Sequence, residues 1–253
     1  MLSITPVKPN WFKDWFNSPY YHHLYFQRDH TEAAHFINRL LDFLQPQANS
    51  RMLDAGCGRG RHAMQLASRG YEVTGIDLAA DSINVARTHA TEKLQFFRHD
   101  MRLPFRADHF DYVFNFFTSF GYFETEGEHD DAIRSFADSL RPDGLLVMDF
   151  LNVQHAADNL VHQQEISRGD VNYFITRWYD ESHFYKKIEV RDSKQPDEPL
   201  IFAEKVAKFR LEDFNEMFAD HQLQIQQVFG DYNFNEYNPA TSPRLIMICR
   251  KGM

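Results

Sequence analysis

The sequence predicts an α/β fold built on a mostly parallel sheet of seven strands, of which the last is antiparallel. Two observations support this prediction. Strand and helix patterns alternate over residues 31–153, and several of the strands are apolar along their whole length, as strands buried on both faces are. The two strand patterns that close the chain are joined by the long segment DYNFNEYNPATSP. That segment has no helical pattern, so the final strand is expected to return antiparallel to its neighbour.

Each element of this region has its own sequence pattern. In the first helix apolar residues recur at helical spacing, Thr31 is in position to act as N-cap, and Pro46 ends the run. A later helix opens with Thr125 and Glu128 in the spacing of a capping box. The remaining elements follow in chain order: a strand through Met52 and Leu53, a helix over 63–68, a strand over 71–77, a helix over 81–90, and strands over 94–100, 110–117 and 145–151.

The chain divides into four regions. Residues 1–30 are rich in aromatic residues and proline without a clear period, which predicts an arm or lid. Residues 31–153 form the predicted core of sheet and helices. Residues 154–210 contain alternating, strand-like segments separated by the turn-rich stretch SKQPDEP, and we interpret them as inserted antiparallel strands that cover a substrate. Residues 211–253 complete the sheet with a helix and two strands.

The bulk composition restricts the class of protein. Acidic residues outnumber basic ones 36 to 27, which argues against a nucleic acid as partner. Two cysteines, Cys57 and Cys249, are too few for a disulfide framework, and no histidine or cysteine pair has the spacing of a metal site. No segment has the apolar length of a signal-peptide core or a membrane span, so a cytoplasmic protein without a membrane partner is expected. The sequence leaves the oligomeric state open.

The stretch RMLDAGCGRG, which ends the first strand, indicates a ligand site. Gly56, Gly58 and Gly60 expose bare backbone there. A dinucleotide site would have glycine or alanine where this chain has Arg61, and a nucleoside triphosphate site would have a lysine after the loop. A carboxylate at Asp54 repels a pyrophosphate and attracts a cation. The loop therefore predicts a cationic ligand.

Two further acids narrow the identity of the ligand. Asp77 ends the second strand, where a carboxylate can accept hydrogen bonds from both hydroxyls of a ribose. Asp100, after the third strand, is in position to accept from an exocyclic amine while the backbone N–H of Met101 donates to a ring nitrogen. A ribonucleoside that carries positive charge and no phosphate is S-adenosylmethionine, which is the expected cofactor. The alternatives are that Asp77 only caps the next helix and that Asp100 is only a turn residue.

Four segments, LDAGCGRGRH, VTGID, HDMRLPF and FDYVFNFFTSFGYF, resemble in order and spacing the first motifs of class I S-adenosylmethionine-dependent methyltransferases, over roughly residues 30–150. The resemblance implies the Rossmann-like fold of that family and a transferase that carries out methylation. It also implies the following contacts: the methionine part of the cofactor with Asp54, Gly56, Cys57 and Gly58, the ribose with Asp77 and Leu78, the adenine with Asp100 and Met101, and the sulfonium group with Asn115 and Phe116.

The N-terminal segment PYYHHLYFQRD is similar to the lid helix of small-molecule members of this family, such as sugar-amine N-methyltransferases. That similarity implies that Tyr21 and Arg28 approach the carboxylate of the cofactor. Past Gly121, Tyr122 and Phe123 are expected to be walls of the pocket.

The methyl acceptor is expected to be a small metabolite with an amine or a hydroxyl group. Enzymes that methylate planar amide or nucleobase nitrogens typically have an Asn/Asp-Pro-Pro-aromatic segment after the fourth strand, where this chain has NFFTSF. No catalytic residue is assigned, because His23, His30 and His129 are candidates for a general base by location alone. Two alternatives stay open: an RNA or protein methyltransferase, and a protein that binds S-adenosylmethionine without catalysis.

Overall fold

The computed structural model describes residues 7–25, 30–195 and 199–252, without the side chains of residues 30–32. Seven strands form one sheet in the order β10-β11-β5-β4-β1-β2-β3. The five strands from β5 to β3 run parallel, whereas β11 is antiparallel to both β5 and β10, so the predicted sheet is confirmed. The strands of this sheet are β1 (Arg51–Ala55), β2 (Glu72–Asp77), β3 (Leu94–Arg98), β4 (Phe110–Asn115), β5 (Leu140–Leu151), β10 (Leu223–Phe229) and β11 (Arg244–Lys251).

Helices cover both faces of this sheet because successive strand residues point into two different cores. On β1, Met52 packs with the helices of one face and Leu53 with those of the other. One face carries α3 (His30–Leu44), α4 (Arg61–Ser68) and α5 (Ala80–Arg87), and the other carries α6 (Glu126–Ser139) and α8 (Leu211–Asp220).

None of the helices that the structure describes is long and apolar enough to cross a membrane.

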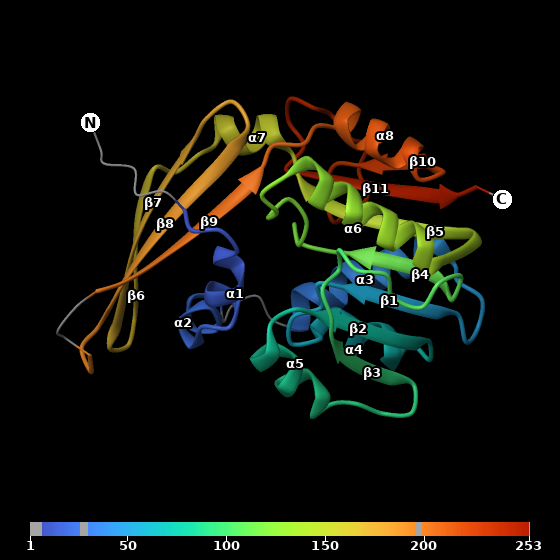
Figure 1. Ribbon diagram of the computed structural model, residues 1–253, viewed down its shortest axis with the longest axis horizontal. Helices are drawn as coiled ribbons and strands as arrows, with labels where there is room; N and C mark the ends of the chain where they lie inside the picture. Colours follow the sequence, from blue (N-terminus) through green and yellow to red (C-terminus); the bar gives the residue numbers. More distant parts are fainter. Residues whose placement is uncertain (1–6, 26–29, 196–198, 253) are drawn as a thin grey trace.

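A second, antiparallel sheet stands beside the seven-stranded one (Figure 1). The predicted insertion of antiparallel strands is therefore confirmed. The edge strand β6 was not predicted, because its sequence QQEISR is mostly exposed and lacks the alternation of apolar residues that marks a half-buried strand. The elements of this region are α7 (Val153–Asp158), β6 (Gln163–Arg168), β7 (Val171–Tyr179), β8 (His183–Asp192) and β9 (Leu200–Ala207).

The N-terminal residues form two short helices, α1 (Trp11–Phe16) and α2 (Pro19–Leu24), which lie between the two sheets (Figure 1). Trp15 is fully buried, with its ring centroid 4.7 Å from that of Phe202 on β9. Its indole Nε1 donates a hydrogen bond to Oε1 of Glu204 at 2.8 Å. These contacts fix α1 to the second sheet.

Several predicted boundaries differ from those in the structure, and two of the differences have a bearing on the site. The first long helix, α3, already begins at His30, so Thr31 lies inside it and is not its N-cap. The strand β4 ends at Asn115 rather than at residue 117. It stops there because Phe117 and Thr118 both have positive φ, at 55° and 59°, and turn the chain away from the sheet.

Candidate functional site

A cavity of about 470 Å³ lies where β1, β2 and β4 end, and α1 and α2 line its other side. The carboxyl ends of parallel strands are the usual place for a ligand in a sheet of this type. Two of the predicted cofactor residues, Asp54 and Asn115, are buried and are not among the residues that line the cavity, and Arg28 lies outside the described residues. The predicted cofactor residues that line the cavity are Tyr21, Gly56, Cys57, Gly58, Asp77, Leu78, Asp100, Met101 and Phe116.

Gly58 presents its backbone directly to this cavity. Its φ is +55°, which favours glycine, and a Cβ added there would meet no atom within 4 Å. A Cβ added at Gly60 would instead lie 2.6 Å from Cζ of Phe96, so that glycine is required by internal packing. A ligand can therefore lie against the bare backbone of Gly58.

Asp77 holds the glycine loop and the start of α5 together. Its Oδ2 accepts the N–H of Gly58 at 2.8 Å, and its Oδ1 accepts the N–H of Ala79 at 2.8 Å. Burial raises the pKa of Asp77, and these two backbone donors oppose that shift. Each carboxylate oxygen has a second acceptor position, so this geometry accommodates both the local capping role and a ribose at the cavity wall.

Two buried acceptors next to the glycine loop lack a donor. Oδ2 of Asp54 and Oδ1 of Asn115 find no hydrogen-bond partner among the described residues, although Nδ2 of Asn115 donates to the carbonyl of Ala55 at 2.9 Å. Burial, and then the charge of Asp77, raises the pKa of Asp54 to about 7. An unpaired buried acceptor costs about 1–3 kcal/mol. These residues therefore fit a ligand that brings positive charge, as the sulfonium and ammonium groups of S-adenosylmethionine do.

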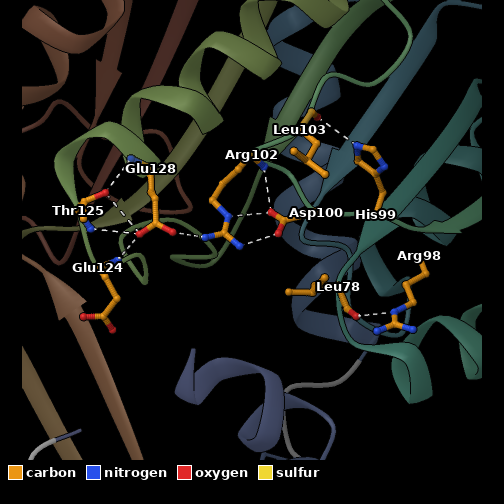
Figure 2. A network of polar contacts seen from close by, with 9 residues as sticks. All are labelled: Leu78, Arg98, His99, Asp100, Arg102, Leu103, Glu124, Thr125 and Glu128. Atoms are coloured by element: carbon orange, nitrogen blue, oxygen red, sulfur yellow. Dashed lines mark hydrogen bonds and ion pairs between the residues drawn. The ribbon is translucent and has the colours of Figure 1, made fainter. Parts of the chain in front are cut away.

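Asp100 is fixed by Arg102 (Figure 2). Its two carboxylate oxygens accept hydrogen bonds from the guanidinium at 3.0 and 2.6 Å, and Arg102 also pairs with Glu128 of α6. Glu128 forms the predicted capping box with Thr125, which is confirmed. Burial alone would raise the pKa of Asp100, but the hydrogen bonds and charge of Arg102 lower it overall. Asp100 is thus ionised at neutral pH and only accepts hydrogen bonds, as recognition of an amine requires.

The same arginine joins Asp100 to a wall of the cavity. The backbone N–H of Arg102 donates to Oδ1 of Asp100 at 3.1 Å, so Asp100 also shapes a turn. The guanidinium carbon of Arg102 lies 4.9 Å from the ring centroid of Phe123. Phe123 and Tyr122 line the cavity, as predicted for the residues past Gly121.

Residues 52–144 match the protein family described as "Methyltransferase domain". This segment contains the glycine loop, Asp77 and Asp100, which the fold brings to one cavity. Residues 52–144 are thus a methyltransferase domain, and the chain is an S-adenosylmethionine-dependent methyltransferase. The methyltransferase resemblance, the enzyme class and the cofactor predicted from the sequence are confirmed.

Two curated relatives illustrate the similarity in sequence. The methyltransferase is 27% identical over 218 residues to the "Putative methyltransferase YqeM" of Bacillus subtilis (strain 168). This match covers 80% of this chain and 84% of that protein. It is 32% identical over 126 residues to the dTDP-3-amino-3,4,6-trideoxy-alpha-D-glucopyranose N,N-dimethyltransferase of Streptomyces venezuelae. The second match covers 48% of this chain and 51% of that protein, so it spans about half of each.

Solved structures share the fold of the methyltransferase. One is an S-adenosylmethionine-dependent methyltransferase from Clostridium acetobutylicum ATCC 824, with a TM-score of 0.74, 15% identity, and coverage of 92% of this chain and 97% of that one. Another is CalS10 with S-adenosylmethionine bound, an amino pentose methyltransferase from Micromonospora echinaspora, with a TM-score of 0.65, 22% identity, and the same coverage of 92% and 97%. At these identities the similarity concerns the fold alone.

The methyltransferase also places at the cavity several residues that were not predicted. The segment RGRH was a usable signal for some of them, because it contains the end of the glycine loop and the first turn of α4. Tyr21 of α2 was predicted from the resemblance of its segment to a lid helix, whereas the other residues of α1 and α2 at the cavity gave no signal in the sequence. These additional lining residues include Phe12, Phe16, His22 and Tyr25 in and directly after α1 and α2, Arg59, Arg61 and His62 near the loop, and Ser119 after β4.

The histidines proposed as general bases do not lie at the cavity where the structure describes them. Nδ1 of His23 is 2.8 Å from the hydroxyl of Tyr173, and His129 packs among phenylalanine rings. The side chain of His30 lies outside the described residues. His22 lines the cavity instead, and burial lowers its pKa to about 4, so its imidazole is neutral at pH 7.

Cofactor binding to the methyltransferase is expected to release a proton from Asp54. The pKa of this residue is about 7 in the free protein, and a cation beside it would lower that pKa by favouring the carboxylate. Below pH 7 the ligand must therefore displace a proton. We expect the affinity for S-adenosylhomocysteine, which carries an ammonium group, to rise by up to about tenfold per pH unit below pH 7 and to level off above it.

Calorimetric titration in two buffers of different ionisation enthalpy measures the released proton directly. Asp54→Asn is the matched variant, because it keeps the size of the side chain and cannot titrate. Loss of the proton release in this variant is the expected result, and an unchanged pH dependence would show that another group is responsible.

Proposed function

We propose that this enzyme transfers the methyl group to an amine of a small molecule, and that the acceptor is an amino sugar. The observation that carries the proposal is that the lid helices and the glycine loop line one and the same cavity. The acceptor has to fit between α1 and α2 on one side and the cofactor on the other. This enclosure favours a small molecule over a folded RNA or protein.

The names of two similar proteins support the choice of an amine. The relative from Streptomyces venezuelae is named as an N,N-dimethyltransferase of a dTDP-linked amino sugar. The structure from Micromonospora echinaspora is named as an amino pentose methyltransferase. An amine suits the site chemically as well, since it attacks as the free base and needs no strong general base to activate it.

The residues of the chain contribute orientation and exclusion of water. When bound, S-adenosylmethionine supplies a methyl group that is already activated by its positive sulfur. The ring centroid of Phe16 lies 5.0 Å from that of Tyr21 and 5.4 Å from that of Tyr122, so these rings form a continuous aromatic wall. Such a wall keeps water out and presents ring faces to positive charge. Alignment of two bound reactants is worth effective concentrations of roughly 10⁵–10⁸ M.

The proposal is tested by incubating the enzyme with isotopically labelled S-adenosylmethionine and matched acceptors. The set comprises amino sugars in free and nucleotide-linked form, the same sugars with a hydroxyl in place of the amine, total RNA, and a protein extract. We expect S-adenosylhomocysteine to form with the amino sugars alone and mass spectrometry to place the label on nitrogen. Label on a hydroxyl, on RNA or on protein would overturn the proposed acceptor. No product with any acceptor would support a binding protein without catalysis.

A further inference from the structure

The backbone adopts an unfavourable conformation directly after β4. Phe117 and Thr118 follow each other with φ of 55° and 59°, in the left-handed region that residues with a side chain rarely adopt. Neither residue is glycine, asparagine or aspartate, the types that tolerate this conformation. Such a conformation persists only where the surroundings impose it, and it is often found at functional sites.

Asp149, a fully buried residue of β5, imposes this turn. Its Oδ2 accepts the N–H of Phe117 at 2.8 Å, and its backbone carbonyl accepts the N–H of Thr118 at 3.0 Å. The N–H groups of both left-handed residues are therefore bound to a single residue. Oδ2 also accepts the hydroxyl of Tyr232 at 3.0 Å, so the carboxylate is firmly held.

Arg244 of β11 completes the arrangement. Its Nε and Nη2 donate to Oδ1 of Asp149 at 2.8 and 2.7 Å, and Nη2 also donates to Oγ1 of Thr118 at 3.0 Å. The arginine thus binds both the carboxylate and the turn that the carboxylate holds. A buried aspartate would be costly without such a partner.

The turn itself forms part of the cavity wall. Phe117 and Ser119 line the cavity, and a Cβ added at Gly56 would lie only 2.7 Å from Cβ of Ser119, so the turn is pressed against the glycine loop. The ring of Phe117 stacks on His62 at 5.0 Å between centroids, and the guanidinium carbon of Arg61 lies 4.4 Å from the same ring. A change in the turn would move the side chains on which the cofactor end of the cavity rests.

We propose that Asp149 and Arg244 are positioning residues of the methyl-transfer site. The pair holds the left-handed turn that sets Phe117 and Ser119 against the glycine loop, although neither member of the pair lines the cavity. The inference goes beyond the proposed function and concerns the cofactor end of the site. It therefore survives if the acceptor turns out to be something other than an amino sugar.

A double-mutant cycle with Thr118→Gly tests the role of the pair, because glycine adopts the left-handed conformation without strain. Asp149→Asn is expected to weaken the binding of S-adenosylhomocysteine at least tenfold in the natural background. In the Thr118→Gly background the same substitution is expected to weaken binding less than threefold. Calorimetry measures both affinities, and the melting temperature of each variant is recorded alongside.

A purely structural role gives a different pattern. Asp149→Asn would then lower the melting temperature in both backgrounds and change the affinity by the same factor in each, which would overturn the proposal. Arg244→Lys serves as a milder second variant, since it keeps the charge and removes the two-pronged contact with Asp149. We expect its effect on affinity to depend on the Thr118 background in the same way, and an equal effect in both backgrounds would count against the pair.

Discussion

Replacing Asp77 by alanine is expected to weaken the binding of S-adenosylhomocysteine by about 100-fold or more. A hydrogen bond to a charged group contributes about 1.5–3 kcal/mol, and two such bonds from the ribose hydroxyls amount to a factor of this size. The substitution also frees the N–H of Gly58, which Asp77 accepts at 2.8 Å, so the loop loses part of its support. Both effects lower the affinity for S-adenosylhomocysteine.

Calorimetry measures this loss, and Asp111→Ala is the matched control. Asp111 lies at the other end of the sheet, near the start of β4, and its Oδ2 accepts the N–H of Arg51 at 2.7 Å. Its removal therefore also costs a backbone acceptor without touching the cavity. We expect both variants to lose stability and only Asp77→Ala to lose affinity. Equal affinity in the Asp77→Ala variant and the natural protein would contradict the ribose assignment.

Much of the cofactor side of the cavity could be predicted because its parts are local in sequence. Asp77 ends a strand of the parallel sheet, and Gly58 and Asp100 each come shortly after one. The carboxyl ends of such strands meet at one edge, so recognising three strands was enough to bring these residues together. The packing of Met52 and Leu53 on opposite faces of the sheet likewise follows from the period of a strand.

The side of the cavity that α1 and α2 form could not be predicted from the ends of strands. With six residues, α1 has fewer than two turns, so its apolar residues show no helical period. Its position is decided by contacts with residues far along the chain, such as the bond from Trp15 to Glu204, 189 residues away. The resemblance of PYYHHLYFQRD to a lid helix predicted Tyr21 at the cavity, but no apolar pattern within the first thirty residues predicts the contacts of α1.

The backbone conformation after β4 could not be predicted from the sequence for a related reason. The run of aromatic residues through Phe117 has strong strand propensity and predicts a longer strand. The left-handed turn at Phe117 and Thr118 is imposed from outside the segment, by the carboxylate of Asp149. Arg102 is a similar case, because its bond with Asp100 is local but its pairing with Glu128 depends on where α6 packs.

Gly58→Ala is expected to abolish most of the cofactor affinity while leaving the enzyme folded. The new methyl group meets no protein atom within 4 Å, so it occupies the space in which a ligand would lie against the backbone. The positive φ of 55° makes the substitution cost about 1–2 kcal/mol of the free energy of unfolding. Because the ligand can no longer lie close to the backbone, the affinity for S-adenosylhomocysteine is expected to fall by roughly 100-fold or more, which is about 3 kcal/mol of binding free energy.

Gly70→Ala is the control that separates the cost of alanine at a positive φ from the loss of contact with the ligand. Gly70 follows α4 with a φ of +95°, and a Cβ added there also meets no atom within 4 Å, but it does not line the cavity. The two variants therefore share the backbone cost and differ only in what lies beside the new methyl group. Denaturant unfolding should show similar losses of stability, whereas calorimetry should show lost affinity for Gly58→Ala alone. If Gly58→Ala binds S-adenosylhomocysteine as the natural protein does, the ligand does not lie against this loop.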